Sequence, residues 1–353
     1  MTPTPDMSSV KPSLVEVSTP ARLHLGFLDL GASLGRRFGS IGLAINSHQT
    51  VIEVSPAEQL TIVGVDDTGT IEKIHCLIER FLTHSQSLIS ENNFQPALTI
   101  KSLIPEHSGL GSGTQLALTI GRALTEFYGL PFSTLDIAEI MGRGKRSGIG
   151  ITTFDHGGFV VDGGLAADTR LPPMLFNTPF PAEWRILLIF DPKHQGVHGE
   201  AEVNAFRDLP EFPQANSQAI CQLTLMQLLP ALVEQNIDAF GSAVTEIQSL
   251  IGEHFAPIQG GLFSSKRVAT LIEQAQLAGH KGIAQSSWGP TGCVFVDSES
   301  TAKQLQNKLQ AYCAEHNELD GITMHIAAAT DTGAKVQRLA APTQISQLRS
   351  HHG

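Results

Sequence analysis

Residues 105–114 read PEHSGLGSGT, a stretch of small and turn-forming residues between two segments of different periodicity. Before it, residues 97–101 alternate apolar and polar side chains, as a half-buried strand does. After it, residues 114–128 carry apolar side chains at helical spacing, and Gly129 and Pro131 supply stop signals. The sequence therefore predicts a strand, a tight loop and the N-terminus of a helix.

A loop of this kind can bind an anion. The N–H groups of the first helical turn have no partner inside the helix, and the helix dipole places partial positive charge there. Small side chains also let an anion approach the backbone closely. We therefore predict that residues 108–114 bind a phosphate or diphosphate, with a plain glycine-rich turn as the alternative. The spacing matches neither the dinucleotide-binding Gly-x-Gly-x-x-Gly nor the lysine-ended P-loop.

The composition is that of a globular protein long enough for two domains. The chain has 353 residues, of which 41% are hydrophobic and 16% charged. Its formal net charge of −11 argues against nonspecific nucleic-acid binding, which needs a basic surface. The four scattered cysteines contain no Cys-x-x-Cys pair, so we expect reduced, structural thiols. No targeting peptide or membrane-spanning run is evident, so we expect a cytoplasmic protein without a membrane partner.

Two more regions near the N-terminus carry cations. Residues 15–30 alternate as strands do, with a break near Pro20, and place Arg22 and His24 on one face. This face is either an exposed polar edge or the wall of a ligand site. The glycine-rich loop at 31–42 contains two adjacent arginines, which are either solvated or an anion clamp.

A second glycine-rich stretch follows the first helix. Residues 142–150 place three cations in four positions among glycines, so they form either a surface loop or a second anion site. The pair Gly157-Gly158 allows two backbones to approach closely. Residues 65–70 read VDDTGT and are interpreted as a polar turn before a helix.

The remaining pattern is mixed, with a proline-rich boundary near residues 168–183, and indicates an α+β fold. Helices are expected at 71–84, 135–140, 200–207, 216–235, 237–253, 265–279 and 302–312. Strands are expected within 42–64 and at 185–190, 293–296 and 322–328.

The first loop resembles the phosphate motif Pro-x-x-x-Gly-Leu-Gly-Ser-Ser of the GHMP superfamily (galactokinase, homoserine, mevalonate and phosphomevalonate kinases). Here Gly113 replaces the second serine. These kinases also carry Ser-Gly-x-Asp, whose Asp orients or deprotonates the substrate hydroxyl. Aligning Ser147-Gly148 and Gly157-Gly158 puts Gly150 at that position, and glycine cannot act as a base.

The GHMP resemblance implies a two-domain GHMP-kinase-like α+β fold. We expect a flexible tail at 1–13 and an N-terminal domain at 14–180, similar to ribosomal protein S5 domain 2. A ferredoxin-like α/β domain is expected at 181–353.

Several segments together resemble the β-ribofuranosylaminobenzene 5′-phosphate synthase family of tetrahydromethanopterin biosynthesis. They are residues 20–29, 108–114, 147–164, 198–200 and 285–291. The resemblance implies condensation of 5-phospho-α-D-ribose 1-diphosphate (phosphoribosyl pyrophosphate) with 4-aminobenzoate, or with an analogue such as 4-hydroxybenzoate. Carbon dioxide and pyrophosphate leave, and a C-glycoside forms. An ATP-dependent small-molecule kinase and a noncatalytic binding protein are the alternatives.

The same resemblance implies the site residues. Phosphate binding is expected from Ser108, Gly109, Leu110, Gly111, Ser112, Gly113, Thr114, Lys145, Arg146 and Ser147. Catalytic roles are expected among Arg22, His24, Asp29, Asp155 and His198. Substrate binding is expected from Glu200, Ser286, Ser287 and Trp288.

Within these sets, we expect the cations to neutralise the negative charge of the diphosphate leaving group. One aspartate carries Mg²⁺ or stabilises an oxocarbenium-like centre. One histidine acts as acid/base or binds the carboxylate, and Trp288 stacks on the ring or packs in the core. We expect magnesium as a cofactor, with ligands that the sequence does not assign, and we do not expect ATP. We expect the protein to be a homodimer.

Overall fold

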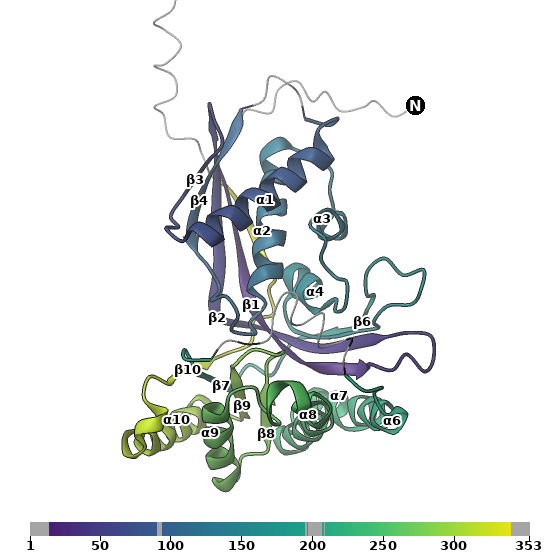
Figure 1. The fold of residues 1–353 in the computed structure, drawn as a ribbon, viewed down its shortest axis with the longest axis vertical. Helices are drawn as coiled ribbons and strands as arrows, with labels where there is room; N and C mark the ends of the chain where they lie inside the picture. Colours follow the sequence, from purple (N-terminus) through teal and green to yellow (C-terminus); the bar gives the residue numbers. More distant parts are fainter. Residues whose placement is uncertain (1–13, 90–93, 195, 197–206, 208, 340–353) are drawn as a thin grey trace, which may run out of the picture.

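The computed structural model describes residues 14–89, 94–194, 196, 207 and 209–339. These residues form two α+β units, which lie one above the other in Figure 1. The predicted tail at 1–13 and nearly all of the helix predicted at 200–207 lie outside the described residues. The α+β class predicted from the sequence is confirmed.

The upper unit is built on one sheet. Its central strands β1 and β2 form a long antiparallel pair, β4 continues on the other side of β2, and β5 also pairs with β2. The strand order is β11-β1-β2-β4-β3, with β6 beside β5. The strands are β1 Leu14–Asp29, β2 Phe38–Ala57, β3 Thr61–Val63, β4 Gln95–Ser102, β5 Phe159–Asp162, β6 Met174–Thr178 and β11 Lys335–Leu339.

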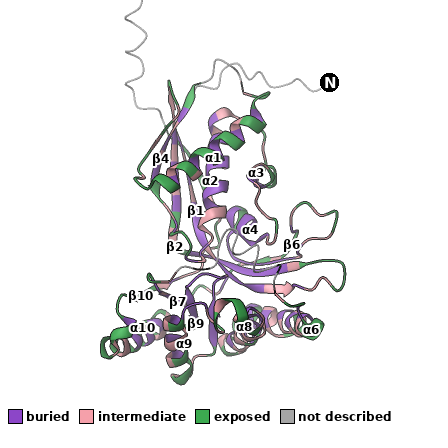
Figure 2. Cartoon of the chain, viewed as in Figure 1, coloured by how far each residue is buried: buried purple, intermediate pink, exposed green. Residues whose placement is uncertain are grey.

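Four helices cover one face of this sheet (Figure 1). They are α1 Thr68–Ser85, α2 Ser112–Tyr128, α3 Thr134–Ile140 and α4 Ile149–His156. The helix α2 is buried on most sides, as Figure 2 shows, because its apolar residues pack between the sheet and α1. It ends at Gly129, whose φ of 66° is the left-handed conformation that terminates many helices.

The lower unit contains a second antiparallel sheet of order β10-β7-β9-β8. Its strands are β7 Arg185–Phe190, β8 Gly282–Gln285, β9 Gly292–Val296 and β10 Thr323–Ala327. Its helical segments are α6 Gln214–Leu223, the π turn Thr224–Leu228, α7 Leu229–Val233, α8 Ile237–Gln259, α9 Lys266–Leu277, α10 Glu299–Glu315 and the 3₁₀ turn Asn317–Leu319.

Both faces of the lower sheet are buried. Along β7, Leu187 and Ile189 pack toward α9 and α10, while Ile186 and Leu188 join a core that includes α8 and the ends of β1 and β2. This shared core explains the continuous apolar run of β7. It also joins the two units into one body with the site segments between them.

Two predicted elements differ from the structure. The predicted break near Pro20 is a change of register within one continuous strand, between Pro20 and Ala21, and a second change follows His24. Residues 149–156, for which no helix was predicted, form helix α4, which begins at the end of the glycine-rich stretch 142–150. The polar turn at 65–70 contains Asp67, whose carboxylate caps α1 by accepting the Thr70 N–H at 2.7 Å.

Candidate active site

The predicted phosphate loop lies at the N-terminus of α2. Gly111 precedes the helix with a φ of 85°, and no side chain caps the helix start. Gly109 also has a φ of 85°, and a Cβ atom there would lie 2.2 Å from the carbonyl oxygen of Ser286. Only glycine suits that backbone. The first turn of α2 therefore presents N–H groups that no side chain of the helix start caps, which is the arrangement that binds anions.

Arg22 on β1 holds this loop from the side. Its backbone N–H donates to the carbonyl oxygen of Leu110 at 3.1 Å, and its Nη1 donates to that of Gly109 at 2.5 Å. A Cβ atom on Gly111 would lie 3.0 Å from Cγ of Arg22, so the arginine side chain lies directly against the loop. Arg22 thus places a positive charge beside the N-terminus of α2.

The segment between β8 and β9 joins the same site. Ser286 Oγ donates to the carbonyl oxygen of Gly109 at 2.8 Å and accepts the backbone N–H of His24 at 3.1 Å. The N–H of Ser287 donates to the carbonyl oxygen of His24 at 2.9 Å. Thr291 Oγ1 donates to the carbonyl oxygen of Ser108 at 2.6 Å. Three segments far apart in the sequence therefore meet, and Ser286 acts as the bridge between them.

His24 is buried at this junction, with 6% of its surface exposed. Burial, together with the positive charges of Arg22 and Arg146, lowers the pKa of His24 to about 3, although a hydrogen bond to its own backbone carbonyl opposes the shift. Arg146 therefore belongs to the same electrostatic environment. His24 is neutral at physiological pH, so an acid/base role that needs its cation does not fit.

A pocket opens beside His24 between β1, α8 and the segment after β8. It encloses about 460 Å³ including its mouth. Trp288, predicted to stack on a ring or pack in the core, does line this pocket, and its ring meets that of Phe255 edge-on at 4.6 Å between centroids. The lining is His24, Gly26, Phe27, Gln248, Ile251, Gly252, Phe255, Gln259, Leu262, Gln285, Ser287 and Trp288.

The second predicted anion site, at residues 142–150, contains a carboxylate that was not predicted from the sequence. Asp162, at the end of β5, accepts the N–H of Gly148 at 2.8 Å and so neutralises the N-terminus of α4. Its other carboxylate oxygen accepts the N–H of Gly164 at 2.9 Å, and burial raises its pKa. Ser147 lies beside this carboxylate, and Lys145 is exposed. An anion at this helix start would meet a carboxylate already in place.

Arg143, which was not among the predicted site residues, lies close to the predicted phosphate loop. Arg143 Nη1 is 3.8 Å from where a Cβ atom of Gly113 would be. Its Nε is buried and has no hydrogen-bond partner in the described part of the chain. Burial and the neighbouring charge of Arg80 lower the pKa of Arg143. Its position in the cationic run was visible in the sequence, but its orientation toward α2 was not.

Gly150 lies inside α4 and faces α2. A Cβ atom there would be 2.8 Å from Cγ2 of Thr114 and 3.7 Å from Nε2 of Gln115. A carboxylate at this position therefore needs Thr114 to move. The described structure has no room for the aspartate that the kinase motif carries here.

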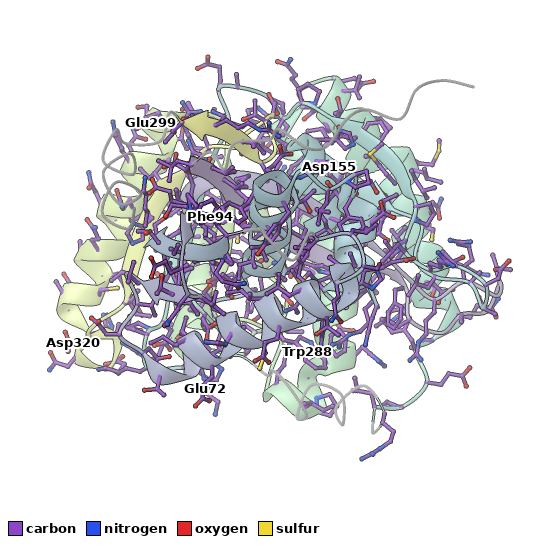
Figure 3. All side chains as sticks on the ribbon, turned by 90° about the horizontal axis from the view of Figure 1, so that it is seen from above. Glu72, Phe94, Asp155, Trp288, Glu299 and Asp320 are labelled. Carbon is purple, nitrogen blue, oxygen red and sulfur yellow. The ribbon has the colours of Figure 1, made fainter. Side chains whose placement is uncertain are left out.

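The two predicted aspartates lie in different surroundings. Asp29 Oδ1 accepts the Gly31 N–H at 2.7 Å and the Ser217 hydroxyl at 2.8 Å, so it fastens the turn after β1 to α6. Asp155 is exposed near the end of α4 and accepts from Thr134 Oγ1 at 2.5 Å. Figure 3 shows Asp155 well apart from Trp288. A catalytic role for Asp155 does not fit this position, while His198 and Glu200 lie outside the described residues.

The described residues do not form a resident metal site. They contain no group of three or more His, Cys, Asp or Glu side chains arranged to hold an ion. The oxygens of Asp162 and the Oδ1 of Asp29 already accept backbone N–H groups. The four cysteines are free thiols. No helix in the described ranges is long and apolar enough to cross a bilayer.

Comparison with known proteins supports the fold and identifies the family. The models for the GHMP kinases N-terminal and C-terminal domains match residues 72–159 and 228–315. The β-ribofuranosylphenol 5′-phosphate synthase of Methanothermobacter thermautotrophicus is 34% identical over 304 residues, 80% of this chain and 89% of that protein. The Archaeoglobus fulgidus enzyme of the same name is 35% identical over 314 residues, 86% and 93% of the two chains. The chain belongs to this synthase family.

Solved structures show the shared scaffold of the family and the GHMP kinases. A homoserine kinase from Cytophaga hutchinsonii has a TM-score of 0.62 at 16% identity, covering 94% of this chain and 99% of its own. The mevalonate kinase of Methanococcus jannaschii has a TM-score of 0.62 at 18% identity, covering 89% and 98%. The chain therefore has the fold of the GHMP kinases.

Proposed function

We propose that this protein condenses phosphoribosyl pyrophosphate with a 4-substituted benzoate, releasing carbon dioxide and pyrophosphate. The observation that carries this is that two features adjoin. One is the uncapped N-terminus of α2 with Arg22 beside it, and the other is the pocket lined by aromatic rings, whose described lining residues carry no charge. The first part suits a diphosphate, and the second suits an aromatic ring. The name of the relatives favours 4-hydroxybenzoate, with 4-aminobenzoate as the analogue.

The proposed reaction needs no general base at Gly150. The ring carbon that bears the carboxylate attacks the anomeric carbon, and the carbon–oxygen bond to the diphosphate breaks with its electron pair on the leaving group. The ring–carboxylate bond then breaks, its electron pair restores the aromatic ring, and carbon dioxide leaves. The N-terminus of α2, Arg22, Arg143 and Arg146 stabilise the charge that develops on the diphosphate.

Magnesium belongs in this proposal as part of the substrate. Diphosphate oxygens chelate Mg²⁺ well, and the described residues offer no carboxylate cluster to hold it independently. A GHMP-type kinase reaction is the alternative, but Thr114 occupies the space that the kinase aspartate would need.

The test is incubation with phosphoribosyl pyrophosphate, MgCl₂ and carboxyl-labelled 4-hydroxybenzoate or 4-aminobenzoate. Labelled carbon dioxide that depends on phosphoribosyl pyrophosphate supports the proposal. ADP formed from ATP in the presence of a small alcohol, with no carbon dioxide, supports the kinase alternative. The homodimer and the cytoplasmic location remain predictions, which sedimentation and cell fractionation would check.

A further inference from the structure

We propose that Nε2 of His24 accepts a hydrogen bond from the 4-hydroxyl or 4-amino group of the aromatic substrate. This inference rests on the proposed function and names how the acceptor is recognised. It makes a hydrogen-bond donor at the 4-position a requirement for tight binding. The neighbouring rings of Phe27, Phe255 and Trp288 would enclose the aromatic ring.

The ring of His24 has one nitrogen in use. The ring bonds to its own backbone carbonyl, whereas Nε2 is buried and has no hydrogen-bond partner in the described part of the chain. The bond to the carbonyl therefore involves Nδ1, which must carry the proton. The neutral ring then presents a lone pair at Nε2. A buried acceptor left without a donor is costly, so a ligand donor is the natural partner.

The three glutamine side chains of the pocket are already hydrogen-bonded. Gln248 donates to the Leu25 carbonyl at 2.6 Å, and its Oε1 accepts the N–H of Gln285 at 2.9 Å. Gln285 accepts the Ser264 N–H at 2.6 Å and donates to the Ser287 carbonyl at 3.0 Å. Gln259 donates to the Leu262 carbonyl at 2.9 Å. These amides shape the wall, whereas Nε2 of His24 is a buried acceptor with no hydrogen-bond partner in the described part of the chain.

Charge fixes the direction in which the aromatic acid enters. Among the described residues, those that line the pocket include no lysine, arginine, aspartate or glutamate. A carboxylate buried there would lose its hydration without gaining a cation. Arg22, which donates to the Gly109 carbonyl of the phosphate loop, and Arg146 both act electrostatically on His24. The 4-substituent therefore points inward, and the carboxylate carbon faces the loop, where the anomeric carbon would lie.

The experiment compares binding of 4-hydroxybenzoate and 4-methylbenzoate by calorimetry, with magnesium pyrophosphate present and no turnover possible. The wild-type protein should bind the hydroxy compound about tenfold more tightly, which corresponds to about 1.4 kcal/mol. His24→Phe keeps a ring but removes the acceptor, so the preference should fall to about twofold or less. His24→Gln places an amide oxygen in the same region and should recover part of the preference.

His48→Phe is the matched control. His48 is a partly buried histidine whose ring packs on Phe190 at 5.7 Å, and burial also lowers its pKa. It lies outside the pocket, so its variant should keep the wild-type preference. A merely structural role of His24 would weaken both ligands equally and leave their ratio unchanged.

Each result has a defined meaning. A folded His24→Phe protein with an undiminished preference overturns the inference, even if wild-type protein releases carbon dioxide. A preference that depends on His24, without carbon dioxide release, overturns the proposed function alone. If the His24 variants do not fold, 4-methoxybenzoate decides, because it cannot donate. Wild-type protein that binds 4-methoxybenzoate as tightly as 4-hydroxybenzoate overturns the inference.

Discussion

Acidification should destabilise this protein through His24, and the size of the effect follows from its burial. The unfolded chain binds a proton at His24 near the ordinary pKa of 6.5, whereas the folded chain resists protonation until about pH 3. The stability from this histidine is therefore fully present above the unfolded pKa and is lost as the pH falls toward 3. A difference of roughly 3.5 between the two pKa values corresponds to about 5 kcal/mol.

That amount is comparable to the whole stability of many domains, which is about 5–15 kcal/mol. Urea unfolding should be followed at several pH values between about 8 and 4 for the wild-type protein and His24→Phe. Below about pH 6.5 the free energy of unfolding of the wild-type protein should fall by about 1.4 kcal/mol more per pH unit than that of the variant, and above that pH the two slopes should agree. His48, His254 and His280 also have lowered pKa values, but they are present in both proteins and cancel in the difference. Parallel curves for the two proteins would refute the reasoning.

Three further perturbations test the site. Gly150→Asp should lower the melting temperature and carbon dioxide release without creating ATP-dependent phosphorylation, because its Cβ would lie 2.8 Å from Thr114; a stable variant with full activity would contradict this. Arg143→Gln should raise the KM for phosphoribosyl pyrophosphate about tenfold, measured against Lys145→Gln, whose exposed side chain should matter less; equal effects of the two would count against the geometry. Asp29→Ala should reduce the free energy of unfolding by about 2 kcal/mol in urea titrations, because the Gly31 N–H and Ser217 hydroxyl lose their acceptor; an unchanged midpoint would exclude this role.

The strands and helices that have a clear hydrophobic periodicity were predicted from the sequence. The alternating run before residue 105 is β4, and the periodic run that ends at Gly129 is α2. Helix α4 was missed because Gly148 and Gly150 lower helix propensity. It forms because Ile151 and Phe154 pack into the core and because the Asp162 carboxylate accepts the Gly148 N–H at its N-terminus. Tertiary contacts outweighed propensity there.

In the candidate site, too, the parts marked by local sequence motifs were predicted and the parts formed by tertiary contacts were not. The glycine loop, the Arg22–His24 pair and the Ser286–Trp288 segment were predicted from motifs, because each carries its signal in adjacent residues. The wall of the pocket that α8 supplies was not, since Gln248 and Phe255 read only as residues of an amphipathic helix. Nothing local in a sequence shows which helix face closes a pocket on a distant strand.

Strand β11 has a consequence for how the chain folds during synthesis. It pairs with β1 from Leu14↔Leu339 to Ser18↔Lys335, so β1 is paired on this side by a strand that is made more than 300 residues later. At about 5–20 residues per second, the edge of β1 waits roughly 15–60 s for its partner. Unpaired strand edges are sites of aggregation. The nascent chain therefore passes through a stage in which the upper sheet lacks β11, and emergence of residues 335–339 from the ribosome ends that exposure.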